Sequence, residues 1–226
     1  MAYLIWDTKK INDFSPDEIS GLYNKGFVFT RKGKGEMYRT RSLRIDLSKF
    51  STHTKNKRIL RKTADLQLQT KQLPLPIAEY NWQIHKLGKD YYDQKFGENI
   101  FSASKIKELL TDSQKSNYNL LLCYTEKESI VGYVIAYQND EMIHYAYPFY
   151  DLEKYFNHYG MGMMLRAILF AKESGRKYFY LGSVSRPADI YKLYFRGLEW
   201  NDGQVWRVDI EFLKGLIQES KISYDE

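Results

Sequence analysis

The 226-residue sequence predicts an α+β fold with a mixed sheet. Three apolar segments, 120–124, 130–137 and 142–147, follow one another with hairpin-length links, which is typical of an antiparallel meander. An almost wholly apolar helix is predicted from residue 160 to 171. Residues 178–181 then have the pattern of a short buried strand. Strands joined both by hairpins and by a helix indicate a mixed sheet.

Before residue 50 the chain is predicted to contain one helix and several short strands. Ser15 and Pro16 have the pattern of a helix cap followed by the first helical position. Residues 27–29 are a short strand candidate. The run from Leu43 to Leu47 alternates apolar and polar residues, which predicts a strand with one buried face.

Residues 55–68 are predicted to form a basic helix that docks through one face. Ile59, Thr63 and Leu66 recur at helical spacing on that face, and residues 51–54 could cap the start. Cations on the outward side can neutralise phosphates without reading bases. These outward cations are Lys57, Arg58 and Arg61.

A stiff connector, Leu73–Pro76, divides the predicted elements into two groups. We expect residues 1–72 to form a basic N-terminal region packed on a core made by residues 73–226. Further helices are expected around residues 80–91, 104–110, 188–195 and 212–219.

The composition excludes several classes of protein. No apolar run reaches membrane-spanning length, and the N-terminus lacks a signal-peptide pattern, so a cytoplasmic location and no membrane partner are expected. One cysteine, Cys123, excludes an internal disulfide and a cysteine-rich metal site. No metal ligands are therefore assigned, and we expect a monomer.

Positive charge is concentrated in one segment. Residues 25–71 hold fourteen Lys and Arg against three acids, or 14 − 3 = +11, whereas the whole chain carries 34 − 28 = +6. Such a concentration is the electrostatic footprint of a nucleic-acid partner. The alternative is a solvated basic face.

The start of the apolar helix, residues 159–163, is a candidate phosphate seat. The first N–H groups of a helix have no partner within it, and the helix dipole favours an anion there. Gly160 and Gly162 would let an anion approach the backbone closely. A tight turn without a ligand is the competing interpretation.

The order of these elements resembles the GNAT acyltransferase fold. The family's pyrophosphate loop, Gln/Arg-x-x-Gly-x-Gly/Ala, is similar to residues 157–162, where Asn157 replaces the expected Gln or Arg. A later family motif is similar to Ala188, Tyr191 and Gly197. The resemblance implies a GNAT-like fold with a basic N-terminal extension, and a tyrosine, Tyr191, that protonates the leaving group.

Two blocks within this fold resemble the arginyl- and leucyl-tRNA–protein transferases of the N-degron pathway. The first block consists of Arg44, Ile45, Asp46, Phe50, Lys57 and Arg58. The second consists of Tyr178, Tyr180, Leu181, Gly182, Tyr191 and Lys192. The N-terminal cysteine cluster that members of this family usually carry has no equivalent here.

This resemblance implies an aminoacyltransferase that moves an amino acid, arginine or similar, from charged tRNA to an amine such as a protein N-terminus. No permanent cofactor is implied, because aminoacyl-tRNA is the co-substrate. An acetyl-CoA-dependent N-acetyltransferase and a non-catalytic tRNA-binding module are the alternatives. A Fem-type transferase would need a duplicated fold that this length hardly accommodates.

Site residues follow from these resemblances and from residue chemistry. An aromatic loop at 147–153 could stack a terminal adenine, and Asp151 or Glu153 could meet a cationic aminoacyl side chain. His144 and His158 are possible bases, although a lone histidine is more often structural. The catalytic candidates are Tyr191 and Lys192, and the cofactor candidates are Tyr159, Gly160, Met161, Gly162 and Met163. The substrate candidates are Tyr147, Tyr150, Asp151, Leu181, Gly182 and Ser183, and the tRNA candidates are Arg41, Arg44, Lys57, Arg58, Arg61 and Lys62.

Overall fold

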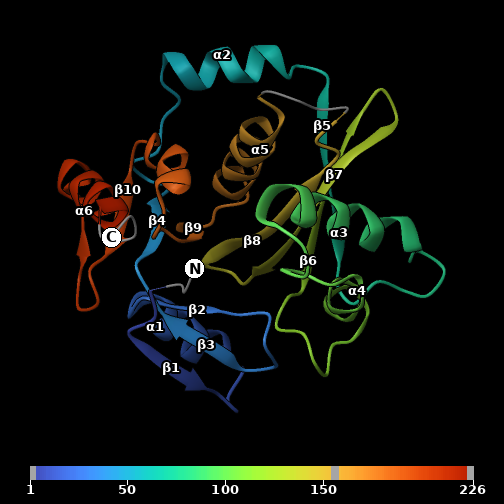
Figure 1. Ribbon diagram of the computed structural model, residues 1–226, viewed down its shortest axis with the longest axis horizontal. Coiled ribbons are helices and arrows are strands. Elements are labelled where there is room, and N and C mark those ends of the chain that lie inside the picture. Colours follow the sequence, from blue (N-terminus) through green and yellow to red (C-terminus); the bar gives the residue numbers. More distant parts are fainter. Residues whose placement is uncertain (1–3, 154–157, 223–226) are drawn as a thin grey trace.

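The computed structural model describes residues 4–153 and 158–222. Within these residues the chain forms a large mixed sheet, a small antiparallel sheet, and helices on both faces of the large sheet (Figure 1). The strand order of the large sheet is β11-β10-β4-β9-β8-β7-β6-β5. Neighbouring strands are antiparallel except β8 and β9, which are parallel. The prediction of an α+β fold with a mixed sheet is confirmed.

The predicted meander consists of β6, β7 and β8, followed by the predicted helix α5 and strand β9. The strands of the large sheet are β4 (Ser42–Asp46), β5 (Leu66–Gln72), β6 (Leu120–Glu126), β7 (Ser129–Gln138), β8 (Met142–Tyr150), β9 (Tyr178–Ser183), β10 (Leu198–Asn201) and β11 (Trp206–Arg207). The small sheet contains β1 (Asp7–Lys10), β2 (Phe27–Phe29) and β3 (Glu36–Arg39). The helices are α1 (Pro16–Asn24), α2 (Thr54–Lys62), α3 (Trp82–Phe96), α4 (Ala103–Thr111), α5 (Tyr159–Glu173), α6 (Ile210–Ile222) and the 3-10 helix η1 (Pro187–Leu193).

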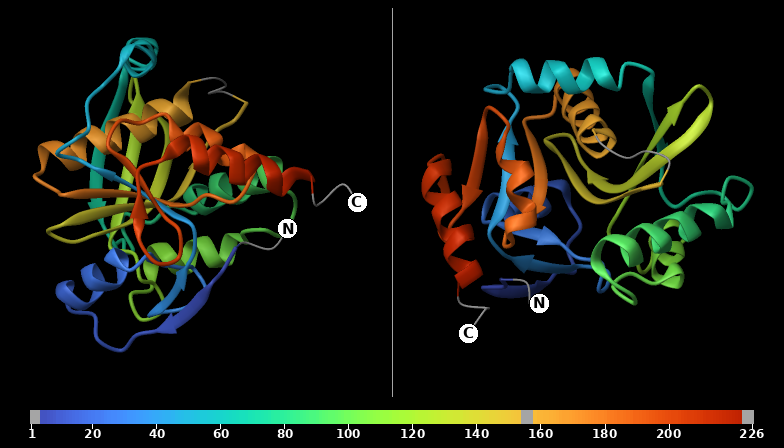
Figure 2. Two further views of the ribbon diagram at one scale, coloured as in Figure 1. Left: turned by 90° about the vertical axis from the view of Figure 1, so that its left-hand side faces the viewer. Right: turned by 45° about the horizontal axis from the view of Figure 1, so that its top comes forward.

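The two faces of the large sheet carry separate cores because side chains alternate along each strand. On β6, Leu120 and Leu122 belong to the core cluster that includes residues of α5 and α6, whereas Leu121 and Cys123 belong to the cluster that includes residues of α1, α3, α4 and the small sheet. Figure 2 shows the helices on either side of the sheet. Apolar side chains on both faces of the central strands therefore hold the three layers together.

Local signals explain the N-terminal elements. The Oγ of Ser15 accepts a hydrogen bond from the Glu18 N–H at 3.4 Å, and Pro16 opens α1 as predicted. The alternating residues of β4 and the segment after it, Leu43, Ile45 and Leu47, are at most 2% exposed.

The predicted helix over residues 55–68 was too long. It ends at Lys62, and Leu66–Gln72 forms β5, which pairs with β6 along its whole length. Leu66 is buried in this strand, so the position assigned to a helix face belongs to the sheet. The period-two pattern of Leu66 and Leu68 was present in the sequence, but the helical spacing of Ile59 and Leu66 obscured it.

The helix expected around residues 188–195 is present as the 3-10 helix η1. A further expectation about local structure was wrong. The expected loop after Tyr147 begins later, because β8 continues to Tyr150 and pairs with β7 there. Tyr147 and Tyr150 are therefore held by a strand.

Residues on both sides of the Leu73–Pro76 connector contribute to the large sheet. β4 lies between β9 and β10, and β5 forms one edge beside β6. Across residues 4–153 and 158–222, no helix is both long and apolar enough to span a membrane.

Candidate active site at the divergence of β8 and β9

The candidate site lies where the two parallel strands separate. β8 and β9 pair only from Met142 to His144, opposite residues 178–180. Beyond this point the register of each strand with its other neighbour shifts by one residue. On β8 the residue left out is Ala146, and on β9 it is Leu181. Bulges of this kind bend a strand and remove a residue from the hydrogen-bonded ladder.

Two neighbouring cavities that share six lining residues lie at the divergence. The first, of about 270 Å³, extends toward the small sheet and is lined by Lys32, Tyr38, Thr40 and His144 among others. The second, of about 390 Å³, extends toward α3. We call them the small-sheet compartment and the α3 compartment. Both are lined by Arg31, Ala146, Tyr147, Leu181, Arg186 and Lys192.

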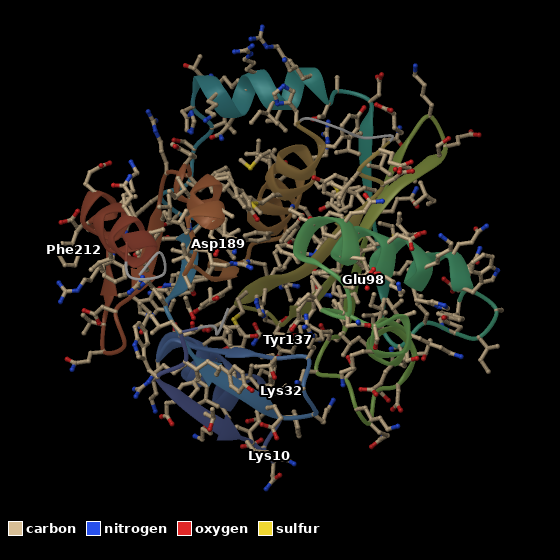
Figure 3. All side chains as sticks on the ribbon, viewed as in Figure 1. Lys10, Lys32, Glu98, Tyr137, Asp189 and Phe212 are labelled. Carbon is tan, nitrogen blue, oxygen red and sulfur yellow. The ribbon has the colours of Figure 1, made fainter. Side chains whose placement is uncertain are left out.

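Cations outnumber carboxylates in this cleft. Arg31, Arg186 and Lys192 line both compartments, and Asp189 lines the α3 compartment. Lys192 Nζ lies 3.3 Å from Asp189 Oδ1 and donates to the Ser183 carbonyl at 2.9 Å. In Figure 3, Asp189 lies on the η1 side of the cleft and Lys32 on the side of the small sheet. An anionic group would be attracted into both compartments.

Asp189 organises the cations of η1. Burial pushes the pKa of its carboxyl upward, but Lys192, Arg186 and two backbone N–H groups outweigh burial and hold the pKa below its ordinary value. Arg186 Nε lies 3.5 Å from Asp189 Oδ2. The carboxylate is therefore engaged within η1 and its preceding turn.

A fourth cation, Lys95, enters from α3. The residue lies at the exposed rim, but its Nζ turns inward and donates to the buried Tyr91 hydroxyl at 2.7 Å. Burial of the ammonium, followed by the charge of Lys192, lowers the pKa of Lys95. This lysine and the η1 cations therefore face one another across the α3 compartment.

Aromatic rings form much of the wall of the α3 compartment. The Tyr91 and Tyr150 rings lie 5.1 Å apart, and Tyr92 stacks on Phe96 at 5.5 Å. Burial raises the pKa of the Tyr91 hydroxyl, so this side chain stays neutral. The rings that line this compartment are Tyr91, Tyr92, Phe96, Tyr145, Tyr147 and Tyr191.

The predicted phosphate seat at the start of α5 is not part of the lining of either compartment. A Cβ on Gly162 would lie 2.8 Å from Thr63 Oγ1, and one on Gly160 would lie 2.8 Å from the Tyr150 hydroxyl. Close packing against these side chains is thus sufficient to explain why glycine stands at both positions. Residues 159–163 line neither compartment, whereas the next residue, Met164, lines the α3 compartment. Asn157, the departure from the GNAT loop, lies outside the described residues.

The basic helix α2 lies against α5 at the top of Figure 1. Lys57, Arg58 and Arg61 are exposed and make no ion pair within the part of the chain that the structure describes. Lys62 is exposed too, and its Nζ lies 3.0 Å from His158 Nε2 at the start of α5. These four candidates are thus available to a polyanion.

The prediction that Arg44 contacts tRNA is corrected by the structure. The arginine Nε donates to Glu199 at 2.8 Å, and its guanidinium lies between the rings of Tyr178 and Trp206 at 3.9 and 4.0 Å. Only 7% of the residue is exposed. It is therefore a buried structural cation rather than a phosphate contact. Arg41, the other candidate nearby, is half-buried, and burial lowers its pKa.

The structure brings some predicted site residues together and separates others. Tyr147, Leu181 and Lys192 line both compartments, Tyr191 lines the α3 compartment, and Gly182 and Ser183 line the small-sheet compartment. Tyr150 and Asp151 line neither, and Asp151 accepts a hydrogen bond from the Glu153 N–H at 3.0 Å. Sequence reasoning missed Arg31, Lys95, Arg186 and Asp189. The charge-dense run around Arg31 was a signal, but nothing in the sequence joined it to α3 and η1.

Comparisons with known proteins agree on one family. A family model described as "Arginine-tRNA-protein transferase, C terminus" matches residues 77–201. A protein of Ruegeria pomeroyi named "Aspartate/glutamate leucyltransferase" is 28% identical over 175 residues, which are 74% of this chain and 61% of that protein. This chain thus spans less than two thirds of that relative.

Solved structures with related architecture are more distant. L-PGS from Bacillus licheniformis has a TM-score of 0.48 and 14% identity over 89% of this chain and 70% of that chain. A GCN5-related glucosamine N-acetyltransferase region of a fungal multi-domain β-N-acetylglucosaminidase has a TM-score of 0.47 and 13% identity, over 85% of this chain and 22% of that chain.

Proposed function

Because this chain belongs to the family described as arginine-tRNA-protein transferase, C terminus, we propose that it transfers an amino acid from a charged tRNA to a protein N-terminus. The observation that carries the proposal is the cationic cleft with two compartments where β8 and β9 diverge, since both of these strands lie in the segment that the family model matches. A transferase must hold two reactants at once, and two compartments that share one junction provide for this.

The α3 compartment is the proposed place of the tRNA terminus. A terminal base stacks on aromatic rings such as Tyr91 and Tyr147, and Lys95 at the rim attracts the adjoining phosphate. The exposed cations of α2 hold the tRNA backbone farther out. α5 contacts α2, and Met164 of α5 lines this compartment, so the two proposed tRNA contacts are linked by one helix.

The small-sheet compartment is the proposed place of the acceptor. Arg31, Lys32, Arg186 and Lys192 line it, and no acid lines it in the described ranges 4–153 and 158–222. These charges favour an acceptor whose first residue is acidic. The name of the Ruegeria pomeroyi relative, an aspartate/glutamate leucyltransferase, supports the same acceptor.

Leucine is the proposed amino acid, in place of the arginine expected from sequence. A guanidinium in the α3 compartment would face Lys95, Arg186 and Lys192, while Asp189 is already paired with two of them. The acids expected to meet it, Asp151 and Glu153, line neither compartment. An apolar side chain avoids this repulsion and fits the aromatic wall.

In the proposed reaction, the neutral α-amine attacks the ester carbonyl carbon. A C–N bond forms, the C–O bond to the ribose breaks, and the ribose hydroxyl leaves with the proton that the amine loses. The amine has a pKa near ~8, so a useful fraction is neutral without an enzyme base. Lys192 at the junction stabilises the developing oxyanion, and Tyr191 relays the proton: its hydroxyl protonates the leaving ribose oxygen and takes up the proton that the amine loses.

The test is transfer of labelled leucine or arginine from charged tRNA to peptides that begin with Asp or Lys. We expect leucine to reach the Asp peptide, and Lys192→Met to lower kcat/KM by about tenfold or more. Lys10→Met, on the exposed strand β1, is the matched control and should leave the rate unchanged. Efficient arginine transfer would overturn the choice of leucine. Acetylation of the peptide from acetyl-CoA, with no transfer from either tRNA, would overturn the function.

A further inference from the structure

His144 is a buried histidine on the wall of the small-sheet compartment. It is 3% exposed, and its Nδ1 lies 2.9 Å from the hydroxyl of Tyr23, which does not line the cavity. The opposite nitrogen, Nε2, is the atom nearest to the position of a Cβ on Gly182, at 3.7 Å. Gly182 lines the same cavity. The Nε2 edge of the ring therefore faces the compartment.

Tyr23 determines which nitrogen of His144 carries the proton. The backbone N–H of Phe29 donates to the Tyr23 oxygen at 3.2 Å, so the buried hydroxyl needs an acceptor for its own proton. His144 Nδ1 is the acceptor within reach. The neutral ring then carries its proton on Nε2, as a donor toward the cavity.

The ring stays neutral at working pH. Burial, and next the charge of Lys192, lower the pKa of His144 to about 3. The tyrosine rings in contact with the His144 ring are Tyr23 on α1, at 5.6 Å between ring centroids, and Tyr118 before β6, at 6.4 Å. Burial raises the pKa of both tyrosines, so neither supplies a counter-charge. The donor at Nε2 is thus fixed rather than switched by pH.

We infer that His144 determines acceptor specificity by donating its Nε2–H to the side-chain carboxylate of the acceptor's first residue. This inference rests on the proposed function. The ligand should be a carboxylate because the Nε2–H group and the nearby Arg31 and Lys32 side chains can only donate hydrogen bonds, so the ligand must accept them. The contact should lie away from the reacting ester, because His144 lines the small-sheet compartment alone and not the junction.

Two substitutions separate this role from a structural one. In His144→Gln the amide nitrogen reaches approximately the place of Nε2 and can donate as that N–H does, whereas in His144→Asn the amide reaches only the place of Nδ1, where its carbonyl oxygen accepts the proton of the Tyr23 hydroxyl. Transfer to Asp-led and Asn-led peptides is measured for each variant. We expect the preference for Asp to survive in His144→Gln and to fall about tenfold or more in His144→Asn, mainly through KM.

The reverse order would overturn the inference. If His144 served only to hold Tyr23, the Asn variant would keep that bond and outperform the Gln variant. Equal losses of preference, or a wild-type enzyme without preference for Asp over Asn, would overturn it as well. Melting temperatures of both variants show whether each has folded.

A binding measurement on the wild-type chain requires no tRNA and does not depend on whether any variant folds. With ¹⁵N-labelled histidine, the His144 ring should show the Nε2–H form, and its Nε2 signal should shift with an Asp-led but not an Asn-led dipeptide. A Nδ1–H form, or no response to either peptide, would overturn the inference. A response without transfer from any charged tRNA would overturn the proposed function and leave the carboxylate site standing.

Discussion

Arg44 and Arg58 carry the same charge in opposite surroundings. Arg44 is paired with Glu199 and enclosed by two rings, whereas Arg58 is exposed on α2. Removing one partner of a buried pair leaves an uncompensated charge. We expect Arg44→Ala to lower the free energy of unfolding by about 3 kcal/mol, and Arg58→Ala by less than about 0.5 kcal/mol. Urea unfolding of both variants measures this, and equal stabilities would show that Arg44 is not the structural cation described.

Asp189 gives folding a dependence on pH. Its folded pKa is depressed, so its stabilising effect is present above the unfolded value of about 3.9 and is lost as the pH falls through the folded pKa. We expect the wild type to exceed Asp189→Asn by about 2 kcal/mol at pH 7 and pH 5, and by progressively less below about pH 4. Urea unfolding at each pH tests this. An advantage that persists unchanged to pH 3 would contradict the pairing with Lys192 and Arg186.

At the residue level, sequence motifs found the part of the site that lies on one stretch of chain. Leu181, Gly182, Tyr191 and Lys192 were predicted together because β9 and η1 follow each other closely. Cations from distant elements were missed. His144 was considered only as a base lacking a carboxylate, and its partner proved to be the Tyr23 hydroxyl, 121 positions away. Pairings over such separations depend on the folded topology.

At the scale of elements, Gly162 controls how closely α5 and α2 pack. A methyl group there would meet Thr63 Oγ1 at 2.8 Å and Cγ2 at 2.9 Å. We expect Gly162→Ala to destabilise the protein by about 1–2 kcal/mol, and Thr63→Ala in the same chain to recover part of that loss.

Gly21, inside α1, is the matched control for this double-mutant cycle. No atom lies within 4 Å of the position of a Cβ there, so Gly21→Ala should stabilise the protein by up to about 1 kcal/mol. Thermal and urea unfolding of the variants provide the energies. Additive effects of the Gly162 and Thr63 changes would contradict direct contact between the two helices.

Strong local signals predicted most elements, and tertiary pairing decided the rest. The Ser15 cap and the apolar meander have local causes, so their predictions are confirmed. Residues 63–72 carry both helical and strand spacing, and the full-length pairing of β5 with β6 selects the strand. The short edge strand β11 pairs over two residues only, which is too short for a periodic pattern that would predict a strand.

At the scale of the whole molecule, the basic segment divides between several places. Its cations include the exposed face of α2, Arg31 and Lys32 in the cleft, and the buried Arg44. In Figure 1, α2 and the small sheet lie at opposite ends of the molecule. A charge count along the chain therefore predicted an anionic partner but could not locate the contact surface, because folding separates neighbouring charges.

This division predicts how the proposed binding of tRNA depends on salt. Each phosphate neutralised by a cation adds about 0.7–0.9 to the slope of log K against log salt concentration. Arg58→Ala with Arg61→Ala should therefore reduce the magnitude of the slope by about one to two units and weaken binding most at low salt. The control, Lys9→Ala with Lys10→Ala, removes the same charge from β1, which lies at the opposite end from α2 (Figures 1 and 3). Filter binding over a salt series measures both slopes. If both double variants change the slope equally, tRNA binding depends on net charge alone. A change confined to the α2 variant places the tRNA backbone on α2, next to α5, which contributes to the lining of the cleft.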